Sequence, residues 1–155
     1  MLKVQTNAPE FSLLDQDGVK HSLLENRGHY TLIYFYPKDD TPGCTDEGRQ
    51  FAALHEQFAA RRCSIFGVSR DSLAAHERFK AKLGFPFELL SDTDETVCTL
   101  FGVMKLKNMY GKQVRGIERS TFLIDGNGVL RREWRGVKVP GHAQAVLDAL
   151  ADIVA

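Results

Sequence analysis

Cys44 is the residue of this sequence whose position best suits chemistry, because it lies where a strand should pass into a helix. Residues 30–36 form an apolar, β-rich run, and residues 37–43 contain two prolines, a threonine and a glycine, typical of a turn that exposes a side chain. A thiol at the start of the following helix lies among free NH groups at the positive end of the helix dipole, and both stabilise a thiolate. The sequence therefore predicts a nucleophilic cysteine at position 44.

The other interpretation of a lone cysteine is a small, buried, inert side chain, which is the commoner case. The turn residues before Cys44 favour the reactive interpretation. Three cysteines are an odd number and no secretory signal precedes them, which argues against a disulfide scaffold. The cysteines are far apart in the sequence, and the five histidines form no close ligand pair with them. We therefore expect neither a metal nor a cofactor.

Composition narrows the classes of partner. The chain has 20 lysines and arginines against 20 aspartates and glutamates, with no long run of either sign, so we expect neither nucleic acid nor an anionic membrane as partner. Residues 1–9 lack a basic flank followed by an apolar run, and no stretch of eighteen apolar residues occurs, so we expect a soluble cytoplasmic protein. A length of 155 residues suits a single domain, 1–155.

The first half of the chain predicts the elements that position Cys44. Residues 11–14 and 19–23 flank an Asp-Gly turn, which indicates an N-terminal β-hairpin. Two buried strands, one helix after each and a short third strand should follow, which implies parallel strands joined by helical crossovers. The expected ranges are strands at 30–36, 64–69 and 87–90, and helices at 44–61 and 71–83. On the second helix, His76 shares the apolar stripe and is expected at the edge of the core.

The second half predicts a helix at 92–101 that carries Cys98, then a hairpin at 120–134 and a last helix at 142–155. Between them, residues 105–118 are polar and glycine-bearing, and we expect a long functional loop without regular structure that leads into Arg119. The whole order predicts an α/β fold with a mixed central sheet and helices on both faces. No exposed apolar stripe is evident, which favours a monomer.

At this point the sequence resembles a known family. Pro37, Thr41 and Cys44 match the Pro-x-x-x-Thr-x-x-Cys signature of peroxiredoxins, which have a thioredoxin-like fold. Further segments look like the Q-type group, also called bacterioferritin comigratory proteins, and the resemblance extends over essentially the entire chain. These segments are 34–47, 67–69, 90–92, 110–112 and 116–125. The resemblance implies a thiol-dependent peroxidase that reduces hydrogen peroxide and organic hydroperoxides.

The same resemblance assigns roles to the matching positions. Cys44 would be the peroxidatic thiolate, Thr41 would bond to the peroxide or thiolate through its hydroxyl, and Arg119 would hold the thiolate and the substrate oxygens. Pro37 would shield the pocket. These roles are intelligible because attack of sulfur on a peroxide oxygen develops negative charge on the departing oxygen, which needs hydrogen-bond donors.

Two further residues enter as support for the site. By likeness to the family, Tyr36 lines the pocket and Glu47, one helical turn beyond Cys44, braces Arg119. The other interpretation of Glu47 is a solvated carboxylate near the start of a helix, favoured there by the helix dipole.

The sulfenic acid formed at Cys44 must condense with a thiol before turnover. Q-type relatives carry a resolving cysteine five residues after the peroxidatic one or on the next crossover helix, but here the first position is Arg49 and residues 71–83 contain no cysteine. We therefore expect a one-cysteine mechanism with an external reductant: a small thiol, a thioredoxin or a glutaredoxin-like protein. The alternative is a two-cysteine mechanism with Cys98, or less favourably Cys63, after local unwinding.

Other functions fit less well. A dithiol oxidoreductase needs a second cysteine at position 41, which is threonine. A cysteine hydrolase needs a histidine base, and His55 lies roughly 16 Å further along the same helix at about 1.5 Å per residue. A non-enzymatic redox sensor, in which oxidation of Cys44 alters contacts through residues 105–118, stays open as an alternative.

Overall fold

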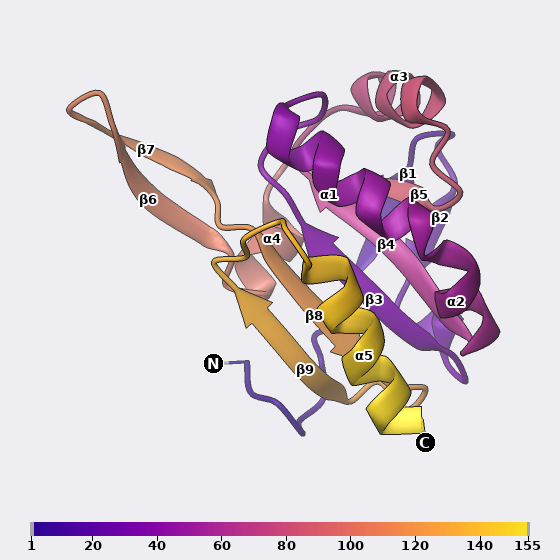
Figure 1. Cartoon of the computed structure of the whole chain (residues 1–155). Helices are drawn as coiled ribbons and strands as arrows, with labels where there is room; N and C mark the ends of the chain where they lie inside the picture. Colours follow the sequence, from indigo (N-terminus) through magenta and orange to yellow (C-terminus); the bar gives the residue numbers. More distant parts are fainter. Residues whose placement is uncertain (1, 155) are drawn as a thin grey trace.

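A mixed β-sheet forms the centre of the fold in the computed structural model, which describes residues 2–154 (Figure 1). Its strands are β1 (Ser12–Asp15), β2 (Lys20–Ser22), β3 (Tyr30–Phe35), β4 (Cys63–Ser69), β5 (Glu88–Ser91), β8 (Ser120–Ile124) and β9 (Leu130–Arg135). They lie in the order β2-β1-β5-β4-β3-β8-β9. β4 lies between β3 and β5 and is parallel to both. β1 pairs antiparallel with β5, and β8 pairs antiparallel with β3. The predicted mixed sheet and N-terminal hairpin, β1–β2, are confirmed.

The two faces of the sheet are buried under separate cores because side chains alternate along each strand. On β3, Leu32 and Tyr34 face one core, while Ile33 and Phe35 face the other, and all four are essentially inaccessible. This is why residues 30–36 form a nearly continuous apolar run in the sequence. The strand that leads to Cys44 is therefore held rigidly from both sides.

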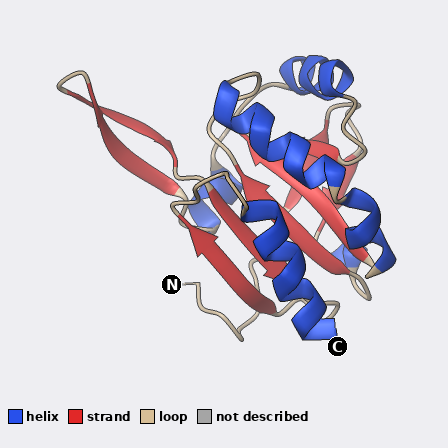
Figure 2. Cartoon of the chain, in the orientation of Figure 1, coloured by secondary structure: helices blue, strands red, loops and turns tan. Residues whose placement is uncertain are grey.

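Helices cover both faces unequally (Figure 2). The first face carries α1 (Pro42–Ala53), α2 (His55–Ala60), α3 (Leu73–Leu83) and α5 (His142–Val154). The second face carries the short α4 (Thr96–Leu100), with the 3-10 turn η1 (Leu24–Asn26) nearby. The predicted last residue of α5, Ala155, lies outside the described residues. Within the described residues, no helix is long and apolar enough to cross a membrane.

The helix predicted over 44–61 is wrong in one respect, because it is divided into α1 and α2 at Leu54. The NH of Leu54 bonds to the carbonyl of Phe51 at 3.2 Å, three residues back, instead of continuing the helical ladder. Phe51 and Phe58 still pack in the same core, with ring centroids 6.2 Å apart. The break thus reorients the chain without exposing its apolar residues.

The prediction of a loop without regular structure at 105–118 is also wrong. β6 (Met104–Met109) and β7 (Lys112–Ile117) form a two-stranded sheet of their own, which we call the arm (Figure 1). Tyr110 and Gly111 both have positive φ, 54° and 78°, as a type I′ hairpin turn requires. The pattern did not reveal these strands because the arm stands away from the body, so neither face shows a buried apolar row.

Candidate active site

Cys44 lies in the first turn of α1, just beyond the carboxyl end of β3, as the sequence predicts. Thr41 caps the helix with extended backbone, and Pro42 fills the first helical position, where its missing NH would have no helical partner. The NH of Thr45 closes the first turn on the carbonyl of Thr41 at 2.8 Å. The turn therefore places the thiol beside the free NH groups at the start of the helix.

The expectation that this turn exposes the thiol is wrong for the conformation described. Cys44 is 2% exposed and belongs to the first-face core together with Tyr34, Tyr36 and Phe51. Its backbone follows the turn, but its side chain points inward, because α1 packs directly over β3. A reagent that reaches this sulfur must enter a confined space.

Arg119 joins Cys44 to Glu47 through the two arms of its guanidinium group. Its Nη2 donates to the Cys44 sulfur at 3.5 Å, and its Nη1 donates to Oε1 of Glu47 at 2.7 Å. Arg119 lies between β7 and β8, far from Cys44 in the chain. Glu47 is 1% exposed, so its interpretation as a solvated helix carboxylate is wrong.

The electrostatics of this pair reflect burial. Removal from water raises the pKa of Glu47 to about 7, although the charge and hydrogen bond of Arg119 act in the opposite direction. Its second oxygen, Oε2, has no hydrogen-bond partner among the described residues. Burial also acts to lower the pKa of Arg119, but the negative charges of Glu47 and Cys44 outweigh it and raise that pKa. The guanidinium group therefore stays charged beside the sulfur.

The structure does not bring the other predicted residues into hydrogen bonds with Cys44. The Thr41 hydroxyl donates to the carbonyl of Lys38 at 2.8 Å, which leaves its oxygen free to accept a bond. Tyr36 is buried in the same core, and Pro37 beside it is half-buried. Among the described residues, Arg119 is the one side chain that hydrogen-bonds to the Cys44 sulfur.

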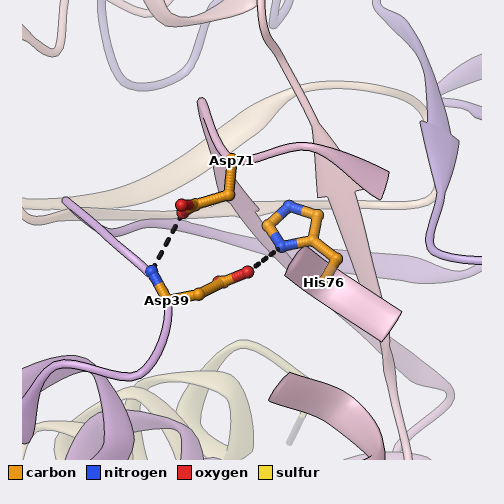
Figure 3. A group of neighbouring side chains, drawn as sticks. All are labelled: Asp39, Asp71 and His76. Atoms are coloured by element: carbon orange, nitrogen blue, oxygen red, sulfur yellow. Dashed lines mark hydrogen bonds and ion pairs between the residues drawn. The ribbon is translucent and has the colours of Figure 1, made fainter. Parts of the chain in front are cut away.

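A buried network behind this loop was not predicted from the sequence. Asp39 accepts a bond from the Tyr36 hydroxyl at 2.6 Å, and its other oxygen lies 2.6 Å from Nδ1 of His76 (Figure 3). Nε2 of His76 lies 2.9 Å from the carbonyl of Leu90, which can only accept, so Nε2 carries a hydrogen. A shared proton must then lie between His76 and Asp39. His76 was expected at the edge of the core, but its side chain is fully buried.

The same network fixes the loop to the start of α3. The backbone NH of Asp39 donates to Asp71 at 2.9 Å (Figure 3). The Ser69 hydroxyl donates to the same carboxylate oxygen. Ligand atoms of Asp39, Asp71 and His76 lie within 4.8 Å of one another, but these hydrogen bonds already engage them. A signal was present in the sequence: an aspartate in the turn that follows a buried strand, and a histidine on an apolar helical stripe.

Neither of the other cysteines approaches Cys44. Cys63 opens β4 and pairs with Tyr30, so it lies at the opposite end of the strands, roughly 20 Å along at about 3.3 Å per residue. Cys98 belongs to the second-face core, so the sheet separates it from Cys44. Burial raises the pKa of Cys63 to about 12, and burial with the adjacent Asp92 raises that of Cys98 well above its usual value. All three cysteines are free thiols.

A central mixed sheet that delivers a cysteine to a helix start, beside a paired arginine, defines a thiol-dependent peroxidase with a thioredoxin-like fold, and the comparisons with known proteins agree. The AhpC/TSA family model matches residues 4–133. Peroxiredoxin Bcp of Xanthomonas campestris is 56% identical over 133 residues, covering 86% of this chain and 83% of the relative. Peroxiredoxin Bcp of Bacillus subtilis is 45% identical over 152 residues, covering 98% and 97%.

Solved structures give the same result. The bacterioferritin comigratory protein of Xanthomonas campestris, solved in work on its alkyl peroxide reduction activity, superposes with a TM-score of 0.90 at 52% identity, covering 94% of this chain and 92% of the other. A PrxQ variant from Xylella fastidiosa gives 0.95 at 40% identity, covering 100% and 99%. The chain therefore belongs to the AhpC/TSA family, within its Q-type peroxiredoxin group.

Proposed function

We propose that Cys44 is the peroxidatic thiolate and that Arg119 is the donor that positions it and its substrate. The observation that carries this proposal is the guanidinium bridge from the Cys44 sulfur to the buried Glu47. A charged donor fixed at this point suits a reaction in which negative charge develops on a departing oxygen. The substrates proposed are hydrogen peroxide and organic hydroperoxides, since the related Xanthomonas protein has alkyl peroxide reduction activity.

In the first step, the Cys44 thiolate attacks the terminal oxygen of a hydroperoxide. A sulfur–oxygen bond forms, the oxygen–oxygen bond breaks, and an alkoxide or hydroxide leaves and takes up a proton. The sulfur is oxidised to a sulfenic acid, and the peroxide is reduced to an alcohol or water. Arg119 donates to the departing oxygen, while Glu47 keeps the guanidinium group from rotating away.

Three residues support this step. Thr41, whose hydroxyl hydrogen is engaged by Lys38, accepts a hydrogen bond from the peroxide. Pro37 covers the mouth of the pocket, and Tyr36 forms its buried wall while anchoring Asp39. Each of these roles is proposed from position together with the family resemblance.

An external thiol resolves the sulfenic acid in this proposal. It condenses with the sulfenic acid to give a mixed disulfide and water, and a second thiol then releases Cys44 and leaves as an external disulfide. The sheet between Cys98 and Cys44, and the distance of Cys63, support an external source. Two solved variants of the Xanthomonas protein each replace one cysteine, and these two cysteines are 36 residues apart in that protein. In this chain, the residue 36 positions after Cys44 is Lys80 of α3, which is not a thiol.

Steady-state peroxide consumption with excess dithiothreitol tests the proposal. We expect the wild type and the double variant Cys63→Ala/Cys98→Ala to turn over at similar rates, because neither residue takes part. Cys44→Ser should be inactive, with unfolding by urea as the control for folding. Loss of turnover in the double variant would favour the two-cysteine alternative, and a single stoichiometric consumption by wild type would favour a redox sensor.

We also propose the setting in which this reaction occurs. Three free thiols suit a reducing compartment, which supports a cytoplasmic location. One sheet draws its strands from residues 12–135, which supports a single domain. Large apolar side chains exposed outside the arm are scattered singly, which supports a monomer.

A further inference from the structure

The arm is an unpartnered structure at the active-site end of the molecule. Its two strands pair with each other and with no other strand among the described residues, and Figure 1 shows them standing out from the body. An isolated two-stranded hairpin is only marginally stable in water. Four of the ten large apolar side chains that the described chain exposes lie in this short segment: Leu106, Met109, Tyr110 and Val114. Such an exposed group on one element indicates an interaction surface.

The charge of the arm differs from that of the rest of the chain. Residues 104–117 contain Lys105, Lys107, Lys112 and Arg115 and no acidic residue. Because the whole chain has a formal net charge of zero, all other residues together sum to −4. The arm is therefore a cationic projection on an acidic body, which attracts acidic partners and orients them toward this end.

The strand register sorts these side chains onto two faces. Leu106 and Arg115 lie opposite each other on one face of the arm. Ile117 lies on the same face and is buried in the second-face core. Arg115 forms an ion pair with Glu95 of the body. The base of that face therefore meets the body. The opposite face, the outer face, carries Lys105, Lys107, Met109, Lys112 and Val114. Lysines and apolar side chains thus share one outward surface.

The base of the arm is fixed and continuous with the catalytic arginine. The NH of Glu118 bonds to the carbonyl of Val103 at 2.7 Å, and Nζ of Lys107 bonds to the carbonyl of Ile117 at 2.9 Å. Arg119, two residues beyond β7, reaches the Cys44 sulfur. A molecule held on the arm is therefore held beside the segment that carries Arg119. Lys105 and Lys112 are exposed and form no ion pair within residues 2–154, so both are free to contact it.

We propose that the outer face of the arm is the docking surface for a protein reductant whose face around its reactive thiol is acidic and partly apolar. This inference rests on the proposed external thiol and names its class. The docked protein's thiolate attacks the sulfenic sulfur of Cys44, so that a sulfur–sulfur bond forms, the sulfur–oxygen bond breaks, and hydroxide leaves and takes up a proton to become water. A second thiol of that protein then attacks its own sulfur in the mixed disulfide; an internal disulfide forms in the partner, which is oxidised by two electrons, and Cys44 leaves as a thiolate. A small thiol needs no such surface.

The test compares two reductants on one variant. Lys105→Glu/Lys112→Glu reverses charge on the outer face, and Lys3→Glu/Lys20→Glu makes the same change in net charge at exposed lysines elsewhere. With a purified thioredoxin of net negative charge as probe, we expect the arm variant to lose at least about tenfold in kcat/KM for the thioredoxin, and the wild-type rate to fall with added salt. The kcat/KM of the control variant should change less than about twofold, because salt screens exposed charges that lie away from the docking surface.

Dithiothreitol separates this inference from the proposed function. The arm variant should match wild type with dithiothreitol, because that thiol does not use the arm. Equal rates of the arm variant and wild type with thioredoxin would overturn the docking proposal alone. Failure of wild type with both reductants would overturn the external-thiol mechanism itself. If sedimentation shows a wild-type dimer that the arm variant dissociates, the outer face binds a second copy of this chain and the proposal is wrong.

Discussion

Arg119 and Glu47 form a 2.7 Å ion pair in which the carboxylate is almost completely buried and one of its oxygens has no hydrogen-bond partner within residues 2–154. Such a pair contributes little net stability by itself, because desolvation offsets the attraction, but breaking it leaves a buried charge. Its geometry holds Nη2 of the guanidinium group at the Cys44 sulfur. The ion pair therefore positions the guanidinium group more than it stabilises the fold, and mutation can separate these two effects.

Replacement of the arginine tests the donor. Arg119→Ala should slow oxidation of Cys44 by hydrogen peroxide about 10²–10³-fold, the effect of removing one preorganised donor. Rapid mixing followed by alkylation of the remaining thiol measures this rate. Since Arg119→Ala also leaves Glu47 without its partner, the double variant Arg119→Ala/Glu47→Gln is the control: it should be equally slow but closer to wild type in urea unfolding. An unchanged second-order rate constant would refute the role of Arg119.

The raised pKa of Glu47 predicts that the stability of the protein depends on pH. Burial raises its pKa from 4.5 to about 7, so between these values the native state binds this proton more strongly than the unfolded chain. The stability from this group is present below pH 4.5 and is lost as the pH rises to about 7. Relative to Glu47→Gln, which does not titrate, the wild-type free energy of unfolding should fall by about 3 kcal/mol across this window. Parallel curves for the two proteins would show that Glu47 has no raised pKa.

Gly43 sets the space available to Arg119. A Cβ at this position would lie 3.1 Å from Nη2 of Arg119, which is tighter than an ordinary contact. Gly43→Ala should therefore displace the guanidinium group and slow Cys44 oxidation several-fold, although alanine favours the helix by roughly 0.5–1 kcal/mol. Gly116→Ala, where the added carbon meets nothing within 4 Å, is the matched control. A faster or equal rate in Gly43→Ala would contradict this close approach.

The buried Asp39–His76 pair and the exposed Asp40–Lys82 pair both tie the active-site loop to α3, so they form a matched comparison. His76→Ala leaves a buried carboxylate without its partner and should destabilise by about 3–5 kcal/mol. Lys82→Ala breaks a pair in which both side chains are more than half exposed and should cost at most about 1 kcal/mol. Urea unfolding measures both. Similar small losses in the two variants would mean that the buried pair does not hold the loop.

The sequence predicts the elements near Cys44 well because their signals are local. The turn at 37–43 and the alternation of apolar positions determine where β3 ends and α1 begins, and Ser72 and Gly84 bound α3 by ordinary capping. Arg119 was found only through the family motif, since its contact with Cys44 spans 75 positions of sequence. The periodicity of apolar residues reports local structure and does not predict a contact between two residues so far apart in the sequence.

The features that escaped prediction depend on tertiary context. Burial of Cys44 and Glu47 follows from the way α1 packs over the sheet, and the same helical spacing would suit a solvated face. The partner of His76 is Asp39, which lies in a turn where acidic residues are common. The arm lacks a buried row of apolar side chains because it stands away from the body, so the pattern that reveals a strand is absent.

The separation of Cys44 from both other cysteines is the central claim, and mass spectrometry tests it most directly. Wild-type protein is treated with a stoichiometric amount of hydrogen peroxide in the presence of dimedone, alkylated, and mapped by peptides. We expect dimedone on Cys44 as the trapped sulfenic acid, with Cys63 and Cys98 recovered as alkylated thiols. An intramolecular disulfide between Cys44 and Cys98 or Cys63 would contradict the one-cysteine mechanism.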